Sequence, residues 1–323
     1  MNNKYIGHEN QIYGVEEVRL VGGKGDGMRL FQVRNGKGLE FTISADRCAD
    51  ISRLSFKGDN FGYFSACGYV SPQYYDKTGL EFLKSFTAGF LTTCGLRSAG
   101  NPCIDAGEEL PVHGTASNIP CENISHWIEN DEIHIKAIIR EASISSYKLL
   151  LEREYIVPLN ENKLYINDKI RNIGSLETPL QVLYHFNVGY PLLNENSVVK
   201  MNSVEVAPRN DHAATAIDRC LVMEKPQRGA AEMCYYHTFR GEAEVSVYNP
   251  ELDNGFVMKY NFAELKFFTE WKMMGEYDYV LGIEPGNCQP DGRDIMRRMG
   301  ELETIKPDEE REFHIRFEFG KNQ

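Results

Sequence analysis

The residues with the clearest chemical potential are two histidines and one glutamate in apolar surroundings. His185 lies in the run Tyr-His-Phe-Asn-Val-Gly-Tyr-Pro, and Asn187 follows it two residues later. His113 stands in Pro-Val-His-Gly, and Glu284 stands in Leu-Gly-Ile-Glu-Pro-Gly. Burying an imidazole or a carboxylate costs free energy unless the group is paired. Titratable groups in such places often exchange protons in a functional site, which makes these residues candidates for one.

Each of the three also has a purely structural explanation. A loop histidine such as His113 is usually satisfied by local hydrogen bonds, and His185 could be a hydrogen-bonded histidine of the core. Glu284 ends an apolar run and needs a donor partner or a raised pKa. The three residues are far apart in the sequence, so they meet only if a sheet brings three strand ends together. The residues alone leave both interpretations open.

Two arginines add to the candidates for ligand contact. Arg47 closes one expected strand, where it either pairs with a turn aspartate or points its guanidinium at a ligand oxygen. Arg97 lies in a segment of small residues, which suits close approach of the backbone to a ligand or a tightly wound loop. Taken alone, Arg97 is more often a surface residue.

The composition restricts the class of protein and its partners. The chain has 323 residues, of which 42% are hydrophobic, which is sufficient for one large core or two modest ones. Its 35 basic and 47 acidic residues give a formal net charge of −12. Such a surface repels nucleic acid and anionic membranes, although a local arginine could still hold a small anionic substrate. We therefore expect neither nucleic acid nor a membrane as a partner.

Cysteine usage and the apolar runs predict the compartment. The 8 cysteines include no C-x-x-C pair, so we expect reduced thiols that pack as small hydrophobes, not a zinc site or a redox motif. No apolar run approaches the ~20 residues that span a bilayer. The start, Met-Asn-Asn-Lys-Tyr, lacks the apolar stretch of a signal peptide. These features predict a cytoplasmic protein.

Alternation of apolar and polar residues dominates the chain and is typical of strands with one face in the core. In the run from Leu164 to Ile170, Asp168 is the exception to the alternation. Short helices are expected at 79–90 and 291–299. Long strands are expected at 17–23, 28–35, 38–45, 132–142, 147–158, 163–173, 178–188, 197–207, 242–249, 254–261, 277–284 and 310–319.

This pattern predicts an all-β fold. No stretch alternates a strand with a ten-residue amphipathic helix, which argues against a parallel doubly wound sheet. No linker and no fixed-period repeat divides the chain. We expect one large antiparallel β-sandwich domain over residues 1–323, with its core at about 15–319. Exposed strand edges could pair in a homodimer.

The segments around His113, His185 and Glu284 resemble, in their order and rough spacing, the aldose 1-epimerase family, also called galactose mutarotases. The chain is most similar to a poorly characterised, aldose-1-epimerase-like branch, over about residues 15–319. The resemblance implies the large antiparallel supersandwich of the mutarotases, with a few short helices. Further segments that resemble this branch are Ala-Asp-Arg at 45–47, Thr-Thr-Cys-Gly-Leu at 92–96, residues 179–193, Trp-Lys-Met-Met at 271–274 and Gly-Arg at 292–293.

The resemblance also implies a reaction, the interconversion of the α and β anomers of a free sugar by acid–base ring opening. Glu284 would take the proton of the C1 hydroxyl, His185 would protonate the ring oxygen, and His113 would hydrogen-bond near that oxygen. A glutamate beside a histidine would raise the pKa of the imidazole and lower its own, which suits these roles. The expected partner is a small sugar, with no metal and no cofactor.

The implied sugar-binding residues form a wider set. Trp271 would offer a flat surface to the sugar ring, although a core tryptophan fits the sequence equally well. Asp211 is the candidate for the aspartate that binds hydroxyl groups. The full set is Arg47, Arg97, Asn118, Asn187, Asp211, Trp271, Lys272 and Arg293. The alternatives are a non-catalytic carbohydrate-binding or sugar-sensing β-sandwich, and a lyase or different isomerase on the same scaffold.

Overall fold

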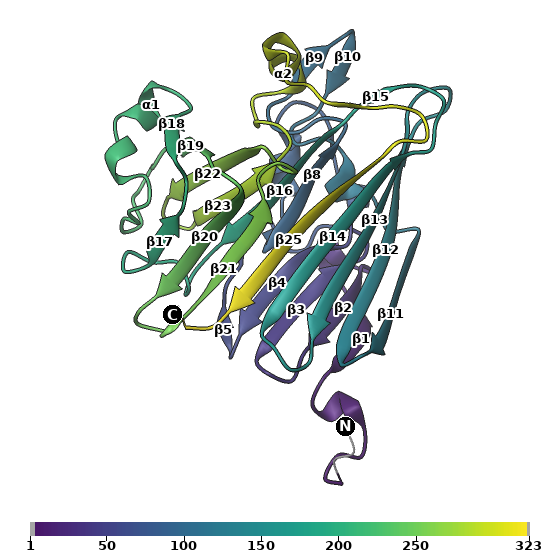
Figure 1. Cartoon of the computed structure of the whole chain (residues 1–323), viewed down its shortest axis with the longest axis vertical. Helices are drawn as coiled ribbons and strands as arrows, with labels where there is room; N and C mark the ends of the chain where they lie inside the picture. Colours follow the sequence, from purple (N-terminus) through teal and green to yellow (C-terminus); the bar gives the residue numbers. More distant parts are fainter. Residues whose placement is uncertain (1–3, 322–323) are drawn as a thin grey trace.

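Antiparallel strands form two layers in this chain (Figure 1). The structure is a computed structural model that describes residues 4–321, so the first three and last two residues of the expected domain lie outside it. An eight-stranded sheet is the front layer in Figure 1. In order across the sheet, its strands are β11 (Asn123–Glu129), β12 (Glu132–Ala142), β13 (Lys148–Pro158), β14 (Lys163–Asn172), β25 (Glu310–Phe319), β21 (Asn254–Asn261), β20 (Glu242–Asn249) and β17 (Val198–Met201).

The second layer consists of two sheets that lie behind the first (Figure 1). The five-stranded sheet contains, in order, β1 (Gly14–Arg19), β2 (Arg29–Arg34), β3 (Leu39–Ser44), β4 (Asp50–Phe56) and β5 (Asp59–Asn60). The six-stranded sheet contains, in order, β18 (Glu205–Pro208), β19 (Met233–Thr238), β22 (Phe267–Met274), β23 (Tyr279–Gly286), β16 (Gln181–Val188) and β8 (Leu91–Leu96).

Short elements connect the sheets. The two-stranded pairs are β6 (Tyr63–Phe64) with β7 (Ala88–Gly89), β9 (Cys103–Asp105) with β10 (Glu108–Leu110), and β15 (Thr178–Pro179) with β24 (Thr304–Ile305). The helices are α1 (Asp211–Ala214) and α2 (Arg293–Met299), with turns of 3-10 helix at η1 (Glu9–Gln11), η2 (Gly23–Gly25), η3 (Pro72–Tyr74), η4 (Glu81–Lys84), η5 (Ala116–Asn118) and η6 (Ile217–Arg219). Within the described chain, no helix has the length and apolar character needed to cross a membrane.

A continuous apolar core fills the space between the layers. The ring of Phe317 on β25 contacts the ring of Phe186 on β16, with centroids 4.9 Å apart. The long strands reach this core through strict alternation of buried and less buried residues, as in β13 and β14. One face of each strand therefore packs inside, as the alternation in the sequence predicts.

The expected all-β antiparallel sandwich is confirmed, although several individual elements differ from the prediction. The strand expected at 197–207 is two strands, β17 and β18, which belong to different sheets. The helix expected at 79–90 is limited to η4, whereas α2 agrees with the helix expected at 291–299. Strand β8 is buried on both faces, so its sequence has no alternation by which it could be found. The homodimer and the cytoplasmic location stay predictions.

Candidate active site

His185 and Glu284 come from neighbouring strands in the six-stranded sheet. Strand β16 pairs with β23 so that Phe186 lies opposite Ile283 and Asn187 opposite Gly282. The same register places His185 opposite Glu284, on one face of the sheet. The imidazole Nε2 lies 3.2 Å from the carboxyl Oε1, and both side chains are almost fully buried. The sheet thus brings together two titratable groups that are distant in the sequence.

His113 reaches the same place from the segment between β10 and η5. Its backbone has a φ of 57°, an unusual value for a residue other than glycine. Two hydrogen bonds fix this conformation: its N–H donates to Gly100 O at 2.8 Å, and its carbonyl accepts from Gly95 N at 3.1 Å. The ring of His113 lies edge-on to that of His185, with centroids 5.5 Å apart. The three predicted catalytic residues therefore converge.

The three residues line a cavity of about 220 Å³. This volume far exceeds the ~30 Å³ that one water molecule occupies in the liquid. Its walls combine rings and aliphatic side chains with a few polar groups. The other lining residues are Leu80, Phe82, Leu83, Phe86, Gly100, Asn101, Val112, Arg209, Glu232, Cys234, Thr269, Trp271 and Pro290. A mostly apolar cavity with a few convergent polar groups is typical of a small-molecule site.

Four buried polar atoms of the lining residues have no hydrogen-bond partner in the described structure. They are His113 Nδ1, His185 Nδ1, Thr269 Oγ1 and Glu284 Oε1. Buried polar atoms of native proteins nearly always have a partner, and an unsatisfied one costs about 1–3 kcal/mol. These atoms are therefore available for hydrogen bonds to water or to a polar molecule in the cavity.

Burial determines which protonation states His185 and Glu284 favour. Loss of hydration, followed by the charge of Glu232, raises the pKa of Glu284 well above its ordinary value, and Arg209 opposes this only partly. Loss of hydration, followed by His113, lowers the pKa of His185 well below its ordinary value. The expectation that the pair would raise the imidazole pKa and lower the carboxyl pKa is therefore wrong. Desolvation outweighs the mutual attraction and favours the neutral form of both groups.

Arg209 and Glu232 are parts of the cavity wall that the sequence did not reveal. Arg209 donates from Nε to Asp291 Oδ1 at 2.8 Å, and Asp291 also accepts from Tyr236 Oη at 2.7 Å. Glu232 accepts from Trp271 Nε1 at 2.8 Å. Both residues stand in polar, partly exposed segments, so no interruption of an apolar pattern marks them. Only the fold shows that they face the pair of His185 and Glu284.

Trp271 lines the cavity, with the centroid of its ring 5.3 Å from that of His185, and its contact with a sugar stays a prediction. The four predicted basic residues lie elsewhere, bonded to other parts of the protein. Arg47 donates to three backbone carbonyl oxygens, and Lys272 donates to two. Arg97 and Arg293 both bind the carboxylate of Glu108. Buried cations require such partners, and here they come from the protein and not from the cavity.

The remaining predicted residues also lie outside the cavity lining. Asn118 is in η5 and donates to Ser117 Oγ at 3.2 Å. Asn187 is fully buried and donates from Nδ2 to the carbonyl of His185 at 2.9 Å, so it supports the backbone of that residue. Asp211 is exposed in the first turn of α1. These residue types suit sugar contacts, but the sequence could not show which way they point.

The fold is similar to that of galactose mutarotase-like proteins of known structure. A Klebsiella pneumoniae structure, provisionally named an aldose 1-epimerase, superposes with a TM-score of 0.90 at 22% identity, covering 97% of this chain and 86% of that one. The Slr1438 protein from Synechocystis sp. superposes with a TM-score of 0.68 at 14% identity, covering 94% of this chain and 100% of that one. A galactose mutarotase-like protein from Clostridium acetobutylicum superposes with a TM-score of 0.67 at 14% identity, covering 97% of this chain and 100% of that one.

The chain belongs to the family described as Domain of unknown function (DUF4432), whose model matches residues 25–319. No curated protein matches the chain. The resemblance to the mutarotases is thus shown at the level of the fold.

Proposed function

We propose that this protein is an aldose 1-epimerase that interconverts the α and β anomers of a free sugar. The observation that carries the proposal is the 3.2 Å contact between His185 and Glu284 in the wall of a cavity that His113 also lines. Anomer exchange requires one group that takes the proton of the C1 hydroxyl and one that protonates the ring oxygen. Each positioned acid or base supplies roughly 10²–10⁴ in rate.

The proton count of the pair is consistent with this reaction. An ion pair of imidazolium and carboxylate carries one proton, and so does a pair of neutral imidazole and protonated carboxyl. In the ion-pair form, Glu284 takes the C1 hydroxyl proton while His185 protonates the ring oxygen. The ring opens, and the pair is left in its neutral form with the proton on Glu284. Rotation about the C1–C2 bond and closure then return both protons and regenerate the ion pair.

The pKa directions favour the open-chain stage of this cycle, and the ion pair that begins ring opening is the less stable form in the free protein. Burial favours the neutral pair, which is the form that accompanies the open-chain aldehyde. His113 stays neutral, since burial and the charge of Arg209 lower its pKa to about 4. A neutral imidazole beside His185 can hydrogen-bond a sugar oxygen without adding a second positive charge. Trp271 adds a flat aromatic surface of the kind that covers a sugar ring.

The test is the rate of anomer exchange, followed by polarimetry or NMR on a panel of hexoses, pentoses, deoxy sugars and sugar acids. We expect Glu284→Gln and His185→Gln each to lower kcat at least ~10²-fold, because each removes one proton-transfer group. Glu109→Gln and His126→Gln are matched controls at exposed positions outside the cavity and should retain full activity. Circular dichroism checks that all four variants are folded.

Three outcomes would contradict the proposal. The mechanism is wrong if no sugar is accelerated, or if Glu284→Gln is fully active. Sugar binding without catalysis, retained in His185→Ala, would indicate a carbohydrate-binding protein. A lasting chemical change in the sugar, beyond its anomer ratio, would indicate a lyase or a different isomerase.

A further inference from the structure

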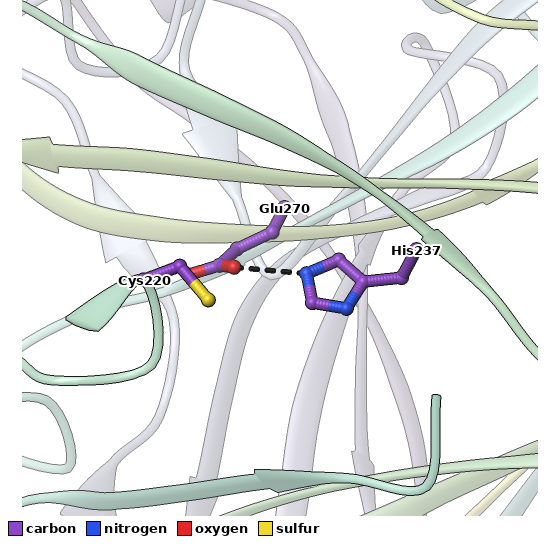
Figure 2. A group of neighbouring side chains, drawn as sticks. All are labelled: Cys220, His237 and Glu270. Atoms are coloured by element: carbon purple, nitrogen blue, oxygen red, sulfur yellow. Dashed lines mark hydrogen bonds and ion pairs between the residues drawn. The ribbon is translucent and has the colours of Figure 1, made fainter. Parts of the chain in front are cut away.

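A second cluster of buried titratable groups lies outside the cavity, on the inner face of the six-stranded sheet. Cys220 follows η6, His237 lies on β19 and Glu270 lies on β22. Figure 2 shows the three side chains pointing toward one another from these separate elements. One sulfur, one ring nitrogen and one carboxylate oxygen all lie within 4.8 Å of one another. Because side chains alternate along a strand, Glu270 faces away from the cavity that Thr269 and Trp271 line.

The imidazole of His237 is held at both ring nitrogens. Its Nε2 lies 3.0 Å from Glu270 Oε2, and its Nδ1 lies 3.0 Å from Ser203 Oγ. When the serine accepts a proton from Nδ1, the lone pair of Nε2 points at the carboxyl group, where either a carboxyl proton or a metal cation can lie between the two. Metal-binding histidines are usually fixed in this way by a partner on the second nitrogen.

Glu270 has an oxygen that the protein leaves unsatisfied. The residue is 0% exposed, and its Oε1 has no hydrogen-bond partner in the described structure. The ammonium of Lys272, two residues further along β22, donates to the carbonyls of Arg219 and Val222 instead. Burial raises the pKa of Glu270, and the side chains of His237 and Cys220 are its hydrogen-bond partners. The cluster therefore brings a thiol, an imidazole and a carboxyl oxygen with unused hydrogen-bonding capacity within 4.8 Å of one another, a set of donor atoms that suits a metal cation.

We propose that Cys220, His237 and Glu270 bind one Zn²⁺ ion. A thiolate, an imidazole and a carboxylate are all zinc ligands, and the soft thiolate favours zinc over magnesium or calcium. Zinc–nitrogen and zinc–sulfur bonds of about 2.0–2.3 Å place tetrahedral ligands roughly 3.3–3.8 Å apart, which small side-chain movements reach from the present separations. Cys220, His237 and one oxygen of Glu270 supply three donor atoms, and a water molecule completes the tetrahedron. The thiolate and carboxylate together neutralise a divalent cation.

The site is structural in this proposal, because its ligands are buried and lie behind the cavity wall. The ion joins the segment after η6 to β19 and β22. Strand β22 carries Thr269 and Trp271 on its other face, so the ion also steadies one wall of the cavity.

The experiment measures metal binding by the full-length protein, independently of any activity. The protein is stripped with a chelator, titrated with Zn²⁺ against a chromophoric competitor, and titrated separately with Co²⁺. We expect one equivalent of zinc, a thiolate-to-cobalt charge-transfer band and a higher unfolding temperature with zinc. Cys220→Ala and His237→Gln should each weaken zinc binding at least ~10-fold, and Ser203→Ala should weaken it about 10–100-fold.

Cys288→Ala is the matched control, since Cys288 is also buried and belongs to a different cluster. It should keep both the zinc affinity and the cobalt band. The proposal is overturned if the folded wild-type protein binds no stoichiometric zinc, or if the cobalt band persists in Cys220→Ala. The cobalt spectrum of the wild-type protein decides the matter even if a substituted protein does not fold. If the protein binds no zinc, His237 and Glu270 form only a hydrogen-bonded pair.

Discussion

His185 and Glu284 show how strongly burial governs single residues in this protein. A histidine and a glutamate in contact normally stabilise each other's charged forms. Here both are removed from water so completely that each favours its neutral form. Nε2 and Oε1 lie 3.2 Å apart without an aligned hydrogen bond, so both atoms are open to a sugar hydroxyl or ring oxygen, which is the property that the proposed reaction needs. The sequence identified both residues as unusual, but the direction of their pKa shifts depends on packing that no pattern reveals.

His113 leads to a prediction about stability and pH. Burial, and secondarily the charge of Arg209, lowers the pKa of His113 from 6.5 to about 4. Between these values the unfolded chain binds more protons than the folded protein, so the free energy of unfolding falls as the pH falls. The contribution is complete above about pH 6.5 and is lost progressively toward pH 4.

Chemical denaturation of the wild-type protein and of His113→Gln, at about pH 7.5 and pH 4.5, measures this contribution. At about 1.4 kcal/mol per pKa unit, the wild-type protein should lose roughly 2.5 kcal/mol more than the variant. Equal losses in both proteins would show that the imidazole is accessible to protons in the folded state.

At the scale of elements, the spacing between β16, β22 and β23 determines where the carboxyl group of Glu284 lies. Gly282 stands two residues before Glu284 on the same face of β23 and has an ordinary backbone conformation. A methyl group at this position would overlap Glu284 Oε1 and press against Trp271. The glycine therefore provides the space that the carboxyl group occupies.

We accordingly predict that Gly282→Ala displaces the carboxyl group while the sheet remains folded. A displacement of about 1 Å in a catalytic group can cost ~10²-fold in rate. The measurement is kcat for anomer exchange, alongside the circular dichroism spectrum. Gly7→Ala, where the added methyl meets nothing within 4 Å, is the control and should be fully active. Unchanged activity in Gly282→Ala would mean that the position of the carboxyl group is not critical.

The elements also show what a single sequence can reveal. Strands with one buried face, such as β13, β14 and β25, were predictable because alternation records burial. Strand β8 was not, since it is rich in small residues, whereas the equally buried β16 carries the large apolar side chains that mark a strand. The same limit applies to the site. His113, His185 and Glu284 interrupt apolar patterns, whereas Arg209 and Glu232 interrupt none and reach the cavity only through the fold.

At the scale of the whole molecule, one buried arginine joins all three large sheets. Arg153 on β13 is 0% exposed and binds both oxygens of Asp168 on β14, at 2.8 and 2.6 Å. It also donates to Asp50 of β4 at 2.8 Å, and Asp50 accepts two hydrogen bonds from Thr93 of β8. Tyr184, the residue before His185, donates to Asp168 at 2.8 Å. The exception to alternation at Asp168 was visible in the sequence, but its partners were not.

This network leads to a prediction for global stability. Arg153→Met should lower the free energy of unfolding by about 3–5 kcal/mol, because it leaves Asp50 and Asp168 buried without a counter-charge. Arg140→Met removes an arginine from the neighbouring strand whose pair with Glu122 is exposed, and it should cost at most ~1 kcal/mol. Equilibrium unfolding in urea measures both. The double variant Arg153→Met/Asp168→Asn should recover part of the lost free energy of unfolding, because it removes one of the two buried carboxylates that have no counter-charge. A cost for Arg153→Met no larger than that for Arg140→Met would show that water reaches the network, and that apolar packing alone holds the sheets together.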